Sequence, residues 1–462
     1  MAFVKFHNLQ LLRMKWEGEQ EYAHLFSTQE DIIYILNNDQ GLSTEILIVA
    51  QGLNCLKMKL FDRATKPKGS QNGFAVLAPM GTSEYDNADY NSAFNAPSLV
   101  KTGGVGNVNQ SQLKELLTGK KVSINPVLVN TYRVFNSRAS SSDLALALEL
   151  THAYITNPQI DLPAYQKMAD AEKLRLKEQV KTAATFFTDT VNLIQANYNS
   201  RFLLKADQVL EAIDPKRSLA VFKERFADAS MMTAVFVGDF SIEAVKPLIE
   251  KYLGSLPSLN HKVKAKDVGI YPPTGKLQKT FYKLSGDKAQ LRFTYSGFAP
   301  FSKKNELMSS FLQAELKERL SSRLKAEDPG MYGPGVNLSL TRANKSYFLC
   351  VVELSCTISK VEDITAAMND EIGKLASGDA LKVNLSNYKE SLIKAAAETT
   401  QSNSALMTYL KKKVQYNDPI DEISSYPEII NSITPKDIST IAKLYLMGKN
   451  SIRFVLLPEK AN

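Results

Sequence analysis

Histidine and cysteine are the side chains whose number and spacing would first reveal metal or nucleophilic chemistry in this sequence of 462 residues. The four histidines are scattered, and the three cysteines include no Cys-x-x-Cys pair. Neither His-x-x-Glu-His nor His-Glu-x-x-His occurs, the spacings that present two histidines and a general base on one helical face. We therefore expect this chain to bind no zinc or other metal.

The individual histidines and cysteines support no other active site. Glu149 and His152 form a Glu-x-x-His pair, but a di-iron site needs two such pairs, so we expect His152 to be an ordinary, partly buried histidine. Cys350 and Cys356 would lie about 20 Å apart in an extended strand, too far for a disulfide, and are expected to be buried. No Gly-x-Ser-x-Gly motif or Cys/His pairing indicates a serine or cysteine hydrolase.

Charge and composition exclude several other classes of protein. The net charge is +8, but the 56 basic residues are spread along the chain with acids between them, which does not indicate a nucleic-acid interface. The Gly-Gly-Val-Gly segment at 103–106 completes no phosphate-binding motif, and we expect it to end a helix. No apolar stretch has membrane-spanning length, and residues 1–26 contain no signal-peptide core. The compartment stays open: the cytoplasm, or the periplasm if the chain belongs to a longer exported protein.

The first part of the chain predicts an α+β domain after a polar lead-in at 1–45. Ser140 and its neighbours up to Asp143 are expected to cap a helix, because Ser and Asp oxygens accept hydrogen bonds from the first helical N–H groups. A long charged helix is predicted over 163–184, and the Pro-containing stretch 254–275 reads as a linker. The predicted strands lie at 46–50, 56–61, 73–78 and 233–237, with a hairpin at 121–135.

The second part of the chain repeats this order of predicted strands and helices. Ile-Asp-Pro-Lys at 213–216 recurs as Ile-Thr-Pro-Lys at 433–436, an offset of 220 residues, and the strand at 232–237 recurs at 452–457 with the same offset. Before the second copy of this motif, the same part of the chain predicts a helix with Leu every fourth residue, at 312–324, and a hairpin at 335–356. We therefore predict two similar domains, 46–262 and 263–462, each a mostly antiparallel β-sheet with helices packed on one face.

Three segments in this order resemble the pitrilysin/insulinase family of zinc metallopeptidases. The strand and Gly-Asp-Phe turn at 235–240, followed by Leu-Gly-Ser-Leu-Pro at 253–257, look like the ending of a domain of that family. The stretch 99–122 is similar to the opening of the third domain in its long bacterial members. Arg-Leu-Lys-Ala-Glu at 323–327 with Met-Tyr-Gly at 331–333 resembles the family's Arg-Leu-Arg-Glu-Glu and Thr-Tyr-Gly segment. The resemblance covers about residues 45–458.

The resemblance implies a non-catalytic half. The family's zinc motif would fall on a helix near 91–100, where Ala93, Ala96 and Pro97 stand in place of its two histidines and glutamate. In the family, an Arg and a Tyr from the non-catalytic half bind substrate and stabilise the oxyanion formed at zinc. By motif position the Tyr is Tyr332, while the Arg is replaced by Lys325, which keeps the charge but loses the bidentate fork.

Each of these residues also has a purely structural interpretation. Tyr332 could be a packing residue, and Lys325 a solvated cation at a helix end. Arg323, two residues before Lys325, could take over the role of the missing Arg only if the helix end were distorted.

Two functions are consistent with this sequence. The first is a non-catalytic half or subunit that encloses and positions a peptide substrate for a complementary half carrying the zinc, and that is inactive alone. The second is an inactive, peptidase-like scaffold or assembly subunit. The first requires a zinc-bearing partner and a peptide substrate, and neither requires nucleic acid or a membrane.

Overall fold

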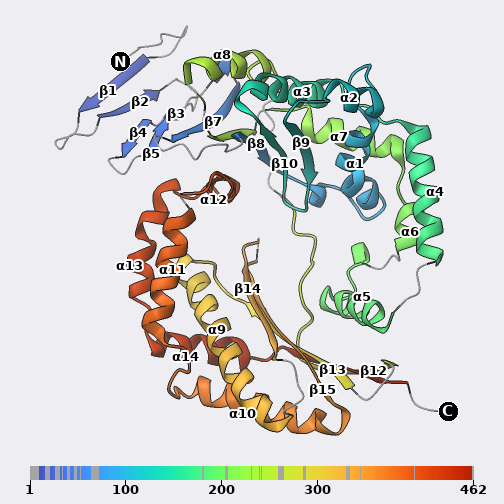
Figure 1. Ribbon diagram of the computed structural model, residues 1–462, viewed down its shortest axis with the longest axis vertical. Helices are drawn as coiled ribbons and strands as arrows, with labels where there is room; N and C mark the ends of the chain where they lie inside the picture. The colour runs from blue at the N-terminus through green and yellow to red at the C-terminus, as the bar shows by residue number, and fades with distance from the viewer. Residues whose placement is uncertain are drawn as a thin grey trace. The chain divides into compact units, whose positions relative to one another are not determined.

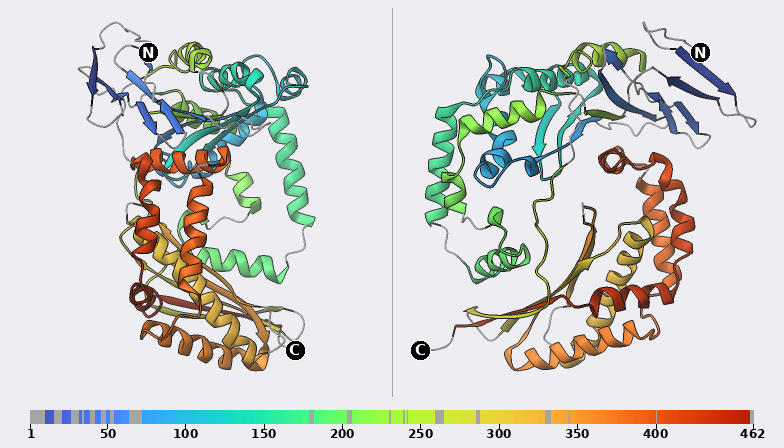
Figure 2. Two further views of the ribbon diagram at one scale, coloured as in Figure 1. Left: turned by 60° about the vertical axis from the view of Figure 1, so that its left-hand side comes forward. Right: turned by 180° about the vertical axis from the view of Figure 1, so that it is seen from behind.

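The computed structural model describes residues 72–178, 182–202, 206–229, 231–238, 240, 242–258, 265–284, 288–328, 333–343, 345–399 and 401–459. It also describes seven strands before residue 72, of which β1 (Gln10–Lys15), β2 (Glu21–Phe26) and β3 (Ile32–Ile33) form a small sheet of their own and β6 (Val49–Gln51) pairs with β7. By their contacts the elements form two units (Figures 1 and 2). Unit 1 comprises Met1–Glu178, Leu204–Val268 and Glu398–Ile420, and unit 2 comprises Gln179–Leu203, Gly269–Ala397 and Asp421–Asn462.

Unit 1 is built on a mixed β-sheet. Strand β11 lies in its middle, parallel to β7 and antiparallel to β8, and the remaining pairs along the sheet are antiparallel. Two of the strands, β4 and β5, precede residue 46, so the sheet begins within the expected lead-in. The strand order is β4 (Ile35–Asn38), β5 (Leu42–Glu45), β7 (Asn54–Arg63), β11 (Thr233–Gly238), β8 (Asn72–Pro79), β10 (Tyr132–Ala139) and β9 (Val122–Leu128).

Unit 2 repeats the plan of the last five of these strands. Its sheet has the order β12 (Lys276–Leu284), β16 (Ser451–Pro458), β13 (Lys288–Phe298), β15 (Tyr347–Thr357) and β14 (Gly335–Thr341). As β11 does in unit 1, β16 pairs in parallel with the first strand and antiparallel with the next. The expected α+β fold with mostly antiparallel sheets is confirmed.

The predicted repeat is visible in the helix before each central strand. Helix α7 (Pro215–Phe226) precedes β11 and helix α14 (Pro435–Leu446) precedes β16. Each begins with proline at its first turn, and the side chain of Asp214 or Thr434 accepts a hydrogen bond from a backbone N–H of that turn. Proline is favoured there because its fixed φ suits the helix and its missing N–H would have no intrahelical partner. The 220-residue match therefore reflects the same helix-and-strand arrangement in the two units.

Both faces of the unit 1 sheet are covered by helices. Phe74, Val76 and Phe236 belong to the core that includes residues of α1 (Tyr90–Gly103), α3 (Leu144–Thr156) and α7. Their strand neighbours Ala75, Leu77, Val235 and Val237 pack with Leu406 and Leu410 of α12 (Asn403–Tyr416). Because successive strand residues point to opposite faces, a sheet covered on both sides has continuous apolar strands. Helices thus lie on a second face as well as on the expected one.

The unit 2 sheet has the same arrangement. Ile452, Phe454 and Leu456 of β16 pack with Phe187, Val191 and Ile194 of helix α5 (Ala183–Gln195). On the sequence this helix follows unit 1 residues, just as α12 follows unit 2 residues. Each unit therefore receives one helix from a distant stretch of chain, which the expected uninterrupted domains 46–262 and 263–462 did not include.

Two local predictions were wrong. The helix expected over 163–184 is two helices, α4 (Leu162–Glu178) and α5, and Thr182 caps the second by accepting from the Thr185 N–H. Asp143 does not cap α3 with its side chain, and its Oδ2 instead accepts hydrogen bonds from the Lys121 N–H and from Ser140 Oγ. The same carboxylate that sequence reasoning placed at a helix end thus ties two chain segments together.

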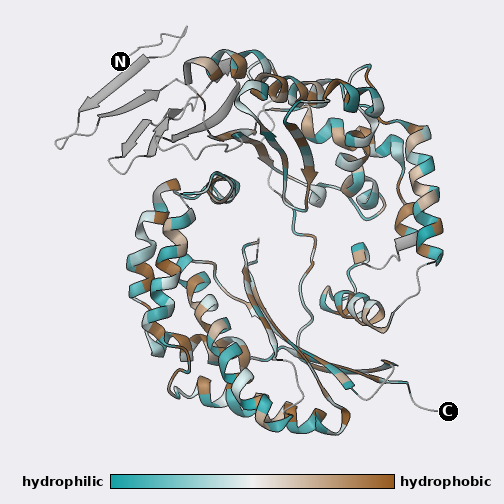
Figure 3. Ribbon diagram, in the orientation of Figure 1, coloured by the Kyte–Doolittle hydropathy of each residue, from teal (hydrophilic) through white to brown (hydrophobic). Residues whose placement is uncertain are grey.

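A buried cluster of charges lies in unit 2. The fully buried Arg319 on α9 (Lys303–Glu327) donates to Glu315 at 2.5 Å, and its Nη1 lies 2.9 Å from Asp379 and 3.4 Å from Glu371 on α10 (Val361–Ala376). Burial lowers the pKa of Arg319, but its hydrogen bonds with Asp379 and Glu315 raise it by more. Polar residues alternate with apolar ones along α9 and α10 (Figure 3), and this cluster is placed on the buried side.

We predict that Arg319→Met destabilises the chain by about 3–5 kcal/mol, because Glu315 would be left buried without its cation and Glu371 would keep only Lys374. Arg323→Met is the matched control, four residues further along α9, where the arginine forms a partly exposed ion pair with Glu327. It should leave the thermal and urea unfolding midpoints nearly unchanged. Equal midpoints for the two variants would contradict the prediction.

Candidate functional site

The resemblance places the family's zinc motif on helix α1, and the residues at these positions are part of the protein core. Ala93 and Ala96 have no exposed surface, and Pro97 is also buried. The two alanines belong to the cluster that contains the stacked rings of Phe222 and Phe226 on α7. The helix ends at Gly103, and Gly104, with φ of 92°, forms the expected helix-ending turn.

Hydrogen bonds hold α1 against α7 at this place. Ser92 Oγ accepts from the Asp214 N–H, and the Ser92 carbonyl accepts from Ser218 Oγ, both at 2.9 Å. Arg217 on α7 bridges Asp89, before the first turn of α1, and Glu224, with both contacts at 2.7 Å. Since every polar group named here has a protein partner, we interpret this cluster as structural.

Zinc does not fit α1. Alanine and proline side chains provide no lone pair for a metal, and the space around them is filled by α7. Elsewhere in the part of the chain that the structure describes, no three His, Cys, Asp or Glu side chains are grouped so that they could hold a metal ion. His152 on α3 lies edge-on to the Tyr252 ring, and burial lowers its pKa although Glu149 opposes this shift.

The structure describes two of the three predicted substrate-binding residues, Lys325 and Arg323. Tyr332 lies outside the described residues. Lys325 is exposed in the last turn of α9, and the partly exposed Arg323 donates to Glu327 on the same helix. Residues two positions apart on a helix do not face each other, so the undistorted α9 does not place Arg323 where Lys325 stands.

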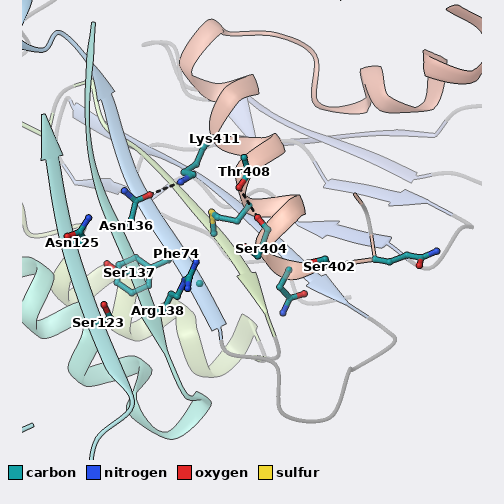
Figure 4. Close-up of a pocket in the computed structure, with 14 residues that line it drawn as sticks. Phe74, Ser123, Asn125, Asn136, Ser137, Arg138, Ser402, Ser404, Thr408 and Lys411 are labelled. Atoms are coloured by element: carbon teal, nitrogen blue, oxygen red, sulfur yellow. Dashed lines mark hydrogen bonds between the residues drawn. The ribbon is translucent and has the colours of Figure 1, made fainter. Parts of the chain in front are cut away.

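Sequence reasoning missed a polar pocket of about 740 Å³ in unit 1, between one face of the sheet and α12 (Figure 4). Ser123 and Asn125 line it from β9, and Arg138 and Asn136 lie directly opposite them on β10. Lys411 of α12 reaches across and donates to Asn136 Oδ1 at 2.7 Å. Burial lowers the pKa of Lys411, and the charge of Arg138 lowers it further.

No local signal in the sequence could have revealed this pocket. Polar residues at every second position of β9 and β10 are typical of strands that face solvent. The helix that covers them is more than 250 residues further along the chain. The pocket appears only when α12 is known to pack on this sheet.

The comparisons with known proteins agree with the fold. Residues 216–392 match the family model described as the peptidase M16 inactive domain. The probable zinc protease PqqL of Escherichia coli is 20% identical over 374 residues, which cover 79% of this chain and 39% of that protein. Its counterpart in Haemophilus influenzae is 21% identical over 399 residues, which cover 85% of this chain and 42% of that protein. The chain thus spans about two fifths of the length of these curated relatives.

Solved structures have a similar fold over 90% or more of this chain. The crystal structure of the periplasmic protease PqqL from Escherichia coli superposes with a TM-score of 0.77 at 16% identity, covering 99% of this chain and 48% of that one. A peptidase M16 inactive domain from Pseudomonas fluorescens superposes with a TM-score of 0.71 at 14% identity, covering 90% and 99%. The resemblance to the pitrilysin/insulinase proteases is confirmed: residues 216–392 match the inactive, non-catalytic domain of the M16 peptidases, and most of the chain is similar to two curated zinc proteases.

Proposed function

We propose that this chain is the non-catalytic half of a zinc metallopeptidase and that it encloses and positions a peptide for a complementary half that bears the zinc. The observation that carries the proposal is the state of α1. On this helix Ala93, Ala96 and Pro97, which the resemblance sets in place of the metal ligands and the general base, are buried. A domain that keeps this fold without its ligands can contribute binding surface but no metal chemistry.

The length of the relatives supports the need for a second half. The curated zinc proteases are more than twice as long as the stretch that matches this chain. The complementary half would be a separate chain or another part of a longer one. No helix in the described part of the chain is long and apolar enough to cross a membrane. Since one structural relative is called a periplasmic protease, we propose the periplasm as the compartment.

Within this proposal, Tyr332 and Lys325 are the residues that act on substrate. The Tyr332 hydroxyl would donate to the oxyanion that develops during peptide hydrolysis, and Lys325 would bind a substrate carbonyl. The exposure of Lys325 leaves its ammonium accessible to a ligand. Arg323 is a weaker candidate, because Glu327 already accepts its hydrogen bond.

A scaffold or assembly subunit is the second candidate function. Lys325 in place of the family's Arg favours it, because an ammonium cannot make the planar, bidentate contact of a guanidinium. Under this alternative the domain would keep its fold for contacts with partners, and Tyr332 would be a packing residue.

We predict that the purified chain, after exposure to zinc and removal of the excess, contains far less than one zinc per chain and cleaves no peptide. Metal analysis by mass spectrometry and an assay with an unfolded peptide measure both properties. About one tightly held zinc per chain would refute the assignment of α1 as a helix without a metal site.

We predict that a complementary chain carrying His-x-x-Glu-His gains peptidase activity on mixing, and that Tyr332→Phe then lowers kcat about a hundredfold with little change in KM. A donor aimed at a developing oxyanion acts mainly in the transition state, so its loss appears in kcat. Lys325→Arg should keep or raise the activity, because the bidentate contact is restored.

Tyr198→Phe is the control for this experiment, since Tyr198 is 53% exposed and lies far from residue 332 in the sequence. It should leave kcat unchanged. An unchanged rate with Tyr332→Phe in an active mixture would identify Tyr332 as a packing residue, and failure of every zinc-bearing half to activate the chain would favour the scaffold.

A further inference from the structure

The polar pocket of unit 1 is lined by hydrogen-bond donors from two strands and one helix. On α12, Ser404, Thr408 and Lys411 follow the spacing that places residues on one side of a helix. They face the cross-strand pairs Ser123–Arg138 and Asn125–Asn136 of β9 and β10 (Figure 4). The pocket therefore has walls fixed by regular secondary structure.

Two cations line the pocket, and none of its lining residues is acidic. Among the described residues Arg138 forms no ion pair, and Lys411 donates only to the neutral Asn136 amide. Burial and the neighbouring guanidinium both disfavour the charged form of Lys411, as the lowered pKa records. An anion in the pocket would remove this electrostatic cost.

The side-chain oxygens of the two asparagines already accept hydrogen bonds from lysines. Lys411 Nζ donates a hydrogen bond to Asn136 Oδ1 at 2.7 Å, and Lys101 Nζ donates one to Asn125 Oδ1 at 2.9 Å. Lysine can only donate, so each amide must turn its oxygen to the lysine and keep its NH2 group for another acceptor. The hydroxyls of Ser123 and Ser404 add two further groups that can donate.

The amino end of α12 adds to the positive electrostatic potential that Lys411 and Arg138 create in the pocket. Gln401, Ser402 and Asn403 line the pocket, and the Ser402 side chain caps the helix by accepting from the Ala405 N–H. The amino end of a helix carries a partial positive charge. This field adds to that of Lys411 and Arg138, and it is of the same sign.

We propose that this pocket is a binding site for an oxyanion, the carboxylate or phosphate of a small ligand, held by Arg138 and Lys411 and by the amides of Asn125 and Asn136. The volume of about 740 Å³ accommodates a ligand of the size of a short peptide or a triphosphate. The site does not depend on the proposed function, because it lies on residues that neither the metal position nor the substrate residues use.

Calorimetric titration of the full chain with sodium tripolyphosphate and with triglutamate tests the proposal, at near-physiological salt so that loose surface attraction is screened. We expect saturable binding of at least one probe, with Lys411→Met and Arg138→Gln each weakening it about tenfold or more. Binding of tripolyphosphate alone would identify the ligand group as phosphate, and binding of triglutamate alone would identify it as carboxylate.

Lys114→Met is the matched control, because it removes one charge from an exposed position on α2 (Gln110–Leu116), outside the pocket. It should leave the affinity unchanged. Lys411→Met should also keep or raise the thermal midpoint of the unliganded chain, since it removes an unneutralised, half-buried charge. Lost binding with an unaltered midpoint therefore cannot come from unfolding. Absence of binding by both probes, or equal weakening by Lys114→Met, would overturn the proposal.

Discussion

The larger sheet of unit 1 and the sheet of unit 2 each have two apolar faces, and the helices that follow the strands along the chain cover only one of them. The second face, which these helices leave open, carries Val235 and Val237 in unit 1, and Phe454 and Leu456 in unit 2. Burying an aliphatic or aromatic side chain contributes about 1.5–3 kcal/mol, so these faces cannot stay exposed. Helices α12 and α5 cover them, and both come from distant stretches of chain. This requirement explains why neither unit is a continuous segment.

The exchange also creates the polar pocket. Helix α12 turns Leu406 and Leu410 to the sheet, where they are buried with Leu77 and Val235. The same helix carries Ser404, Thr408 and Lys411, which line the pocket. The packing of the leucines therefore fixes how far these polar side chains lie from β9 and β10. The donor-lined pocket is therefore positioned by apolar contacts, which hold its like-charged residues together despite their repulsion.

The sequence predicted those features that depend on local pattern. Alternation and the 220-residue match at Ile213 and Ile433 predicted the two sheets, because strand periodicity and helix-starting prolines are local signals. The exchanged helices and the pocket could not be predicted, since they depend on contacts between residues hundreds of positions apart. The prediction of one helix over 163–184 was wrong, because the charged pattern does not indicate that the chain passes from unit 1 to unit 2 between α4 and α5.

The helix on which the resemblance places the family's zinc motif, α1, is packed into the core of unit 1. Ala93 and Ala96 are enclosed with Phe222 and Phe226, and the Ser92–Ser218 and Ser92–Asp214 hydrogen bonds hold α1 and α7 in contact. Imidazole rings at 93 and 97 would enter space that is already filled, and overpacking of a core typically costs about 1–3 kcal/mol. Their nitrogens would also be buried without hydrogen-bond partners. Because α7 fills the space beside α1, restoring the three motif residues alone would not recreate a zinc site, and the helix now serves the stability of the sheet it covers.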